Sequence, residues 1–233
     1  MPFILSLALT LANALILFSF LPKKIDKVQK ENESKQMNYI KVLAKGFAIC
    51  FDKRINLLSL SVFVLQWCLA GFFQLSTLLL AEKFNYSSGE IGMFTTFLGA
   101  CFSGGLFFVI HVLLGRISYL SLLRTGAILL ICSVLSAIYF QETSLVAWIS
   151  VVPMMLGISM MYNVLLVLMS NAVSAQEQGE VMGGGTALKG LAWLSSGLVI
   201  SIFYPNAIAI LVCMMILACI ALLSTMKIKI TFA

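Results

Sequence analysis

Long uninterrupted apolar segments are the feature of this sequence that most restricts its fold. Seven of them follow one another along the chain, at roughly 3–22, 55–81, 89–114, 118–140, 144–170, 183–204 and 206–226. A run of about 18 or more apolar residues is long enough to cross a bilayer as a helix. The runs do not alternate polar with apolar residues, as the strands of a membrane barrel do. The sequence therefore predicts an all-α membrane protein with seven transmembrane helices.

The charge content agrees with a membrane protein. Only 10% of the residues are charged, against about 25% in a typical soluble domain. The net charge of +6 would suggest nucleic acid as a partner of a soluble protein. In a membrane protein, basic residues instead mark the cytoplasmic loops. We therefore expect the lipid bilayer, and not nucleic acid, as the partner of this chain.

The first apolar run has to be distinguished from a secretory signal peptide. Residues 12–14 read Ala-Asn-Ala, which has the small-x-small form of a cleavage site. However, no basic residue precedes the run, and the run continues to Leu21. A signal peptide has a charged start and a shorter apolar core. Residues 1–22 are therefore expected to be a retained first transmembrane helix.

Residues 23–54 form the longest hydrophilic segment, with nine basic residues against four acidic ones. Its first part has the composition of a disordered linker. Its second part places five apolar side chains on one helical face, namely Tyr39, Val42, Leu43, Phe47 and Cys50. This pattern is typical of a helix that lies on a membrane surface. We expect a basic cytoplasmic linker with an amphipathic helix.

The distribution of basic residues predicts the orientation. If residues 23–54 are cytoplasmic, fourteen of the fifteen lysines and arginines fall on the cytoplasmic side, and Lys83 is the exception. Cytoplasmic loops carry this excess of positive charge. The sequence thus predicts a multi-pass protein of the inner (plasma) membrane with its N-terminus outside and a cytoplasmic tail at 227–233.

Enzyme, metal and cofactor chemistry find no support in the sequence. None of the six cysteines forms a C-x-x-C pair, and His111 has no cysteine or histidine at ligand spacing. The glycine-rich stretch around Lys189 is not a phosphate-binding loop, because Gly190 stands where that motif has serine or threonine. We expect no catalytic residues, no metal and no cofactor.

The polar stretch between the fifth and sixth long runs carries signals of helix packing. Ser174 and Glu177 have the spacing of a capping box at a helix start. Gly179, Gly183 and Ala187 recur every four residues and so form a small-residue ridge. Such ridges allow membrane helices to approach one another closely.

Residues 176–183 read Gln-Glu-Gln-Gly-Glu-Val-Met-Gly. The stretch resembles the Q-G-x-x-x-G motif of the major facilitator superfamily, with Gln178, Gly179 and Gly183 as the matching residues. It is most similar to the branch that holds tetracycline and multidrug antiporters. In that branch the motif lies in the cytoplasmic loop between the tenth and eleventh helices, and the charge distribution places it on the same side.

The resemblance extends over the whole chain, but only to the C-terminal half of a facilitator. Residues 1–22 resemble the sixth helix, 23–54 the basic loop between the two halves, and 55–226 a six-helix bundle of helices seven to twelve. Residues 84–92 are similar to an outer loop of the family. Arg116 resembles part of the inner loop between helices eight and nine, although the glycine before it replaces an acidic residue.

No acidic or basic residue lies near the middle of a predicted run. Candidates for a substrate cavity are therefore uncharged residues of the runs that resemble the cavity-lining seventh and tenth helices, namely Gln66, Trp67, Gln74, Tyr162 and Asn163. The alternative for a buried amide is interhelical packing. Either the coupling residues of an antiporter lie in a front half, or the chain does not couple to protons.

The resemblance implies transport of a small molecule by alternating access, as all or part of a permease for drug efflux. The implied partners are the substrate and either a missing N-terminal half or a second copy. The abrupt start at Met1 favours a fragment, and a non-functional fragment or a membrane scaffold without transport is the alternative. A seven-helix receptor is a weaker alternative, since the last run has no internal lysine and no acidic-Arg-Tyr triplet follows the third.

Overall fold

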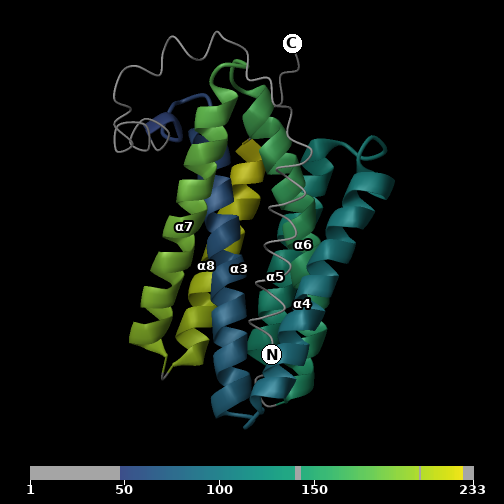
Figure 1. Cartoon of the computed structure of the whole chain (residues 1–233), viewed down its shortest axis with the longest axis vertical. Helices are drawn as coiled ribbons and strands as arrows, with labels where there is room; N and C mark the ends of the chain where they lie inside the picture. Colours follow the sequence, from purple (N-terminus) through teal and green to yellow (C-terminus); the bar gives the residue numbers. More distant parts are fainter. Residues whose placement is uncertain (1–47, 140–142, 205, 228–233) are drawn as a thin grey trace, which may run out of the picture. The chain divides into compact units, whose positions relative to one another are not determined.

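The computed structural model describes residues 48–139, 143–204 and 206–227 of the chain (Figure 1). Six helices there are long and apolar enough to cross a membrane: α3 (Asn56–Glu82), α4 (Ser88–Phe108, continued by the π-helical turn η2, Val109–Leu113), α5 (Tyr119–Tyr139), α6 (Ser144–Asn171), α7 (Gln178–Phe203) and α8 (Ala207–Lys227). The all-α membrane fold is thus confirmed for these residues. The predicted helix 1–22, residues 23–47 of the predicted linker and most of the predicted tail lie outside the described residues.

Local sequence sets where the helices begin. The Ser87 hydroxyl accepts a hydrogen bond from the Glu90 backbone N–H at 3.4 Å, and Glu90 Oε2 accepts one from the Ser87 N–H at 2.7 Å. This capping box satisfies two backbone donors at the start of α4. Asn85 precedes it at φ 54°, in the left-handed region that asparagine tolerates. The short turn between α3 and α4 follows from these residues.

Helices α3 and α6 form the centre of the bundle. Within the most apolar 18-residue window of each helix, 61% of the residues are buried for α3 and for α6, against 17% for α4 and 22% for α7. Helix α3 contacts α6, α7 and α8, while α6 contacts α3, α4 and α5. Figure 1 shows α7 and α4 at opposite edges of the six helices.

The contacts repeat between the first three helices and the last three. If α3, α4 and α5 are exchanged with α6, α7 and α8, the α3–α7 contact becomes α6–α4 and the α3–α8 contact becomes α6–α5, and both are present. The starts of α4 and α7 also share the pattern S-x-x-E-x-G, at 87–92 and 174–179. Because each unit has three helices, the second unit crosses the membrane in the opposite direction to the first. This is an inverted three-helix repeat.

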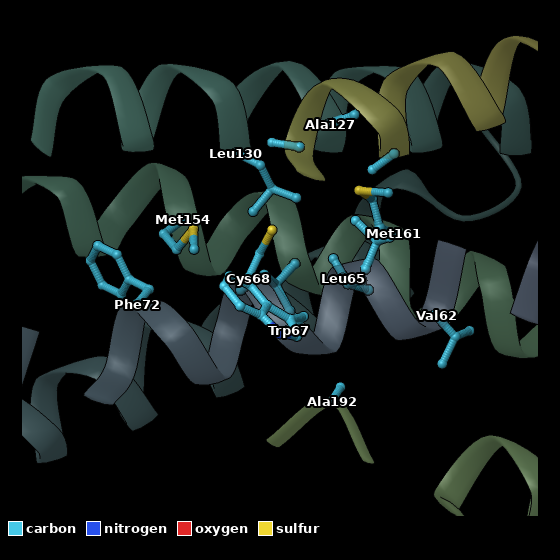
Figure 2. Close-up of a cluster of buried hydrophobic side chains, with 14 of the residues drawn as sticks. Val62, Leu65, Trp67, Cys68, Phe72, Ala127, Leu130, Met154, Met161 and Ala192 are labelled. Carbon is cyan, nitrogen blue, oxygen red and sulfur yellow. The ribbon is translucent and has the colours of Figure 1, made fainter. Parts of the chain in front are cut away.

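Apolar side chains from α3, α5 and α6 meet in the core. Figure 2 shows Leu65 and Cys68 of α3 close to Leu130 of α5 and Met161 of α6, and all four are fully buried. Where α5 crosses α6, Gly126 and Gly157 face each other. A Cβ atom added to Gly157 would lie 2.6 Å from the Gly126 carbonyl oxygen. The absence of side chains at both positions therefore allows the two backbones to touch.

Serine hydroxyls form hydrogen bonds between the packed helices. Ser133 of α5 donates to the Ser150 carbonyl of α6 at 2.8 Å, and the Ser136 and Ser150 hydroxyls are 2.8 Å apart. Ser61 of α3 and Ser224 of α8 form the corresponding pair, also at 2.8 Å. Interhelical hydrogen bonds of this kind contribute about 0.6–2 kcal/mol each in a membrane. The two repeats thus use the same polar connection.

Candidate functional site

A hollow of about 180 Å³ lies between α3, α6 and α7. Its lining combines four residues that carry polar groups with apolar side chains and one glycine. Gln66 comes from α3, Tyr162 from α6, and Thr186 and Lys189 from α7. The rest of the lining is Val62, Leu166, Met169, Val181, Met182 and Gly185.

The polar groups of the hollow lie at a similar depth along their helices. Gln66 and Lys189 each follow the start of their helix by about ten residues, and Tyr162 precedes the end of α6 by about as many. At 1.5 Å per residue, this places them about 15 Å from that end of the bundle. The hydrocarbon core of a bilayer is about 30 Å thick. The hollow therefore lies near the level where the middle of a membrane would be.

Gln66 is buried with an unsatisfied acceptor. The residue is 2% exposed, and its Oε1 atom accepts no hydrogen bond from any described residue. An unsatisfied buried polar group costs about 1–3 kcal/mol. A ligand group that donates a hydrogen bond to this oxygen would remove that cost. Of the five cavity residues predicted from sequence, Gln66 and Tyr162 line this hollow.

Lys189 corrects the expectation that no charge lies near the middle of a helix. The sixth long apolar run was expected to start at residue 183, which would put Lys189 close to the cytoplasmic end. Helix α7 instead starts at Gln178 and ends at Phe203, so Lys189 lies near its centre. Glycines and polar residues between 178 and 186 lower the hydropathy without breaking the helix. The ammonium group forms no hydrogen bond or ion pair with any residue in the described part of the chain.

The other three cavity candidates do not line the hollow. Gln74 donates to the Ser196 hydroxyl at 3.4 Å and so bridges α3 and α7. Trp67 is 5% exposed and belongs to the hydrophobic core shown in Figure 2. Asn163 donates to the Ser159 carbonyl of its own helix at 3.2 Å.

The comparison with known families decides the identity of the fold. The family model of the Major Facilitator Superfamily matches residues 1–197, which is the greater part of the chain. The chain belongs to the Major Facilitator Superfamily. Comparison with curated proteins and with solved structures finds no match. Facilitators are membrane transporters and not enzymes.

The facilitator motif expected at 176–183 takes up a defined position next to the hollow. Gln178 Nε2 donates to the Ser170 carbonyl at 3.2 Å, which connects the start of α7 to the last turn of α6. Ser174 donates from its N–H and its hydroxyl to Glu177 Oε2, at 3.1 and 2.9 Å. The expected serine–glutamate pair therefore forms, although it closes the turn before α7 and does not cap the helix itself.

The small-residue ridge of the same motif faces away from the described helices. A Cβ atom added to Gly179 or Gly183 would meet no atom of another described helix within 4 Å. The expected close packing of the Gly179–Gly183–Ala187 ridge is therefore not seen among these helices. The reason is that α7 packs mainly on α3, through the opposite face that carries Val181, Leu188 and Ala192. Arg116 is exposed in the turn before α5.

Helices α3 and α7 of this facilitator are connected at both ends. At the end of the bundle where α3 and α7 begin, Arg54 lies 2.9 Å from Asp52 and 3.4 Å from Glu177. Hydrogen bonds from Ser174 and then from Arg54 lower the pKa of the Glu177 carboxyl below its usual value. At the opposite end of the bundle, the Tyr204 hydroxyl donates to Glu82. Helices α3 and α7, which carry Gln66 and Lys189, are thus connected to each other at both ends.

The sequence could have indicated Lys189 as a site residue. A capping box at Ser174 and Glu177 predicts a helix that starts just after residue 174, and such a start places Lys189 near the middle of a membrane-length helix. Helix α7 is the least apolar of the six described helices, and this obscures its start. The same helix would also have predicted Thr186 and Met182 as lining residues, because they lie about one and two turns before Lys189.

Proposed function

We propose that this facilitator moves a small molecule across the membrane by alternating access, as the C-terminal bundle of a drug-efflux permease of the tetracycline and multidrug type. The observation that carries the proposal is the buried, unsatisfied Gln66 amide in a hollow at mid-membrane depth. Transporter sites lie near the midplane, where two repeats or bundles meet. A polar side chain without a partner at this depth is a functional candidate.

The exposed faces of α4 and α7 support a second bundle that packs on these two helices. Six glycines of these helices have no other described helix near them, because a Cβ atom added to any of them would meet no atom of a neighbouring helix within 4 Å. They are Gly92, Gly99, Gly104, Gly179, Gly183 and Gly190. Small residues on an exposed membrane helix allow another helix to pack closely. We propose that a second six-helix bundle, either an N-terminal half or a second copy of this chain, covers these faces and closes the cavity.

The proposed orientation places the N-terminus outside and the C-terminus in the cytoplasm of the inner membrane. Arg54 precedes α3, Arg116 precedes α5 and Arg124 lies in the second turn of α5, and these helix starts share one end of the bundle (Figure 1). Lys83 lies at the end of α3, on the opposite side. An excess of basic residues marks the cytoplasmic side. Cysteine labelling of the two ends in intact cells tests this orientation.

A transport assay tests the proposed function. The full chain is reconstituted in liposomes, with and without a co-expressed N-terminal facilitator half, and uptake of labelled tetracycline is compared with empty liposomes. We expect uptake above the empty control in at least one arrangement, and loss of that uptake in Gln66→Leu. Gln176→Leu removes an exposed amide outside the hollow and should transport like the wild type. Uptake equal to the empty control in both arrangements would leave only a scaffold or an inactive fragment.

A further inference from the structure

We infer that the hollow between α3, α6 and α7 selects an organic anion with an apolar body. Its carboxylate, sulfonate or phosphate group would pair with the Lys189 ammonium, while a hydroxyl or N–H of the same molecule would donate to Gln66 Oε1. The inference rests on the proposed transport function and adds the substrate class to it. Nothing in the family match specifies this charge.

Among the described residues, Lys189 is the only charged one that lines the hollow, and the described helices provide no acid to neutralise it. The acidic residues of α3 and α7 are Glu82 at the outer end and Glu180 in the first turn of α7, and α6 has none. A positive charge at mid-membrane depth is expensive unless it is paired. An anionic ligand would supply the missing partner.

The uncharged polar groups restrict the ligand further. Gln66 Oε1 is buried without a partner and can only accept a hydrogen bond, whereas Nε2 of the same side chain carries two donors. The Thr186 hydroxyl already donates to the Met182 carbonyl at 3.0 Å, so it can only accept as well. Lys189, the Tyr162 hydroxyl and Gln66 Nε2 are the donors of the lining that can serve an anionic group. A ligand that matches these donors and acceptors is an acid that also carries a hydroxyl or amino group.

The apolar walls and the size fit one end of a ligand and not a whole drug-sized molecule. Met169 and Met182 are flexible, polarisable side chains that adapt to irregular ligands. A Cβ atom at Gly185 would already contact Met169 Cε at 3.8 Å, so glycine leaves that space to a ligand. The hollow of about 180 Å³ is smaller than the roughly 300–1,000 Å³ of drug-sized sites. We therefore expect it to hold the anionic end of the substrate.

Two fluorescent probes that differ only in an anionic group test the inference. 1-Anilinonaphthalene-8-sulfonate carries a sulfonate and an N–H, and N-phenyl-1-naphthylamine has the same rings and N–H without the sulfonate. Binding of each to the purified full chain is measured in dodecyl maltoside against protein-free micelles. We expect Lys189→Gln to weaken binding of the sulfonate probe about tenfold or more and to leave the neutral probe unchanged. Lys189→Arg keeps the charge and should retain most of the affinity.

A second variant separates a local effect from a change in net charge. Lys53→Gln removes the same charge from an exposed position outside the hollow and should bind both probes like the wild type. Unchanged binding of the neutral probe also shows that Lys189→Gln remains folded. Equal affinity of Lys189→Gln and Lys53→Gln for the sulfonate probe would overturn the inference.

An anionic lipid headgroup is the other source of the same chemistry. The probe measurement is therefore repeated in nanodiscs of phosphatidylcholine, with and without phosphatidylglycerol. Displacement of the sulfonate probe by phosphatidylglycerol in the wild type, but not in Lys189→Gln, would assign Lys189 to lipid and overturn the substrate inference. If liposomes transport neutral compounds equally well with and without Lys189, and show no preference for anions, the anion inference fails while the proposed transport function stands.

Discussion

The contact between Gly126 and Gly157 makes the packing of α5 on α6 testable by single methyl groups. A Cβ atom at Gly157 would lie 2.6 Å from the Gly126 carbonyl oxygen, and one at Gly126 would lie 2.7 Å from the Gly157 carbonyl oxygen. Both obstacles are backbone atoms, so no side-chain rotation relieves them. The helices would have to separate by roughly 1 Å to restore contact distances of about 3.5 Å.

The cost follows from this displacement. Overpacking of a close contact typically costs about 1–3 kcal/mol. A separation of this size would also stretch the Ser133–Ser150 hydrogen bond, which is 2.8 Å long, and so remove about 0.6 kcal/mol or more. We therefore expect Gly126→Ala and Gly157→Ala each to lower the free energy of unfolding by about 1–3 kcal/mol. Because one separation relieves both clashes, the double variant should lose less than the sum of the two.

Gly71 in α3 provides the matched control. A Cβ atom there would contact Met214 Sδ at 3.5 Å, which is an ordinary van der Waals distance. Gly71→Ala should therefore be neutral or stabilising by up to about 1 kcal/mol, since alanine is the better helix former. All three variants can be unfolded reversibly in mixed dodecyl maltoside and dodecyl sulfate micelles, with far-UV circular dichroism as the readout. If Gly157→Ala is as stable as Gly71→Ala, the described α5–α6 crossing is wrong.

Two further predictions concern polar contacts between helices. Because the pKa of Glu177 is lowered in the folded protein, the hydrogen bonds to its carboxylate stabilise the fold above the usual glutamate pKa. They are lost as the pH falls below that value, so the wild type should show faster proteolysis of the loop before α7 in mild acid. Glu177→Gln should show this faster rate already at neutral pH. The Ser61–Ser224 pair should give a coupling energy of about 0.6 kcal/mol in a double-mutant cycle of serine-to-alanine variants, and a coupling of zero would show that the two hydroxyls do not bond.

The sequence predicts the membrane helices well because their signal is local. Each apolar run from 55 onward corresponds to one helix, since a backbone in lipid must satisfy its own hydrogen bonds. Helix starts made of polar and glycine residues carry a weaker signal, and this is why α7 begins at 178 and not at 183. That shift of five residues changes Lys189 from a cytoplasmic charge into a candidate site residue.

Side-chain direction and helix pairing are harder to predict than helix position. Gln66 and Trp67 are neighbours in sequence, yet they point about 100° apart on α3, so one lines the hollow and the other enters the core. The close approach at Gly126 and Gly157 depends on which faces of two helices meet, which no single segment specifies. The ridge at Gly179 and Gly183 has the pattern for close packing, but its face is not covered by any described helix.

The connections between helices indicate which wall of the hollow can move during transport. Helix α7 is joined to α3 by the Arg54–Glu177 ion pair, the Gln74–Ser196 hydrogen bond and the Tyr204–Glu82 hydrogen bond, at three levels along the bundle. Its contact with α6 is much slighter. Gln66 and Lys189 therefore belong to one tied pair of helices, whereas Tyr162 belongs to the other wall. A substrate that bridges Lys189 and Tyr162 would draw α6 toward α3 and α7. It would therefore bind more tightly to the state in which α6 lies close to this pair, and such a difference in affinity is what allows a ligand to shift a transporter between two states.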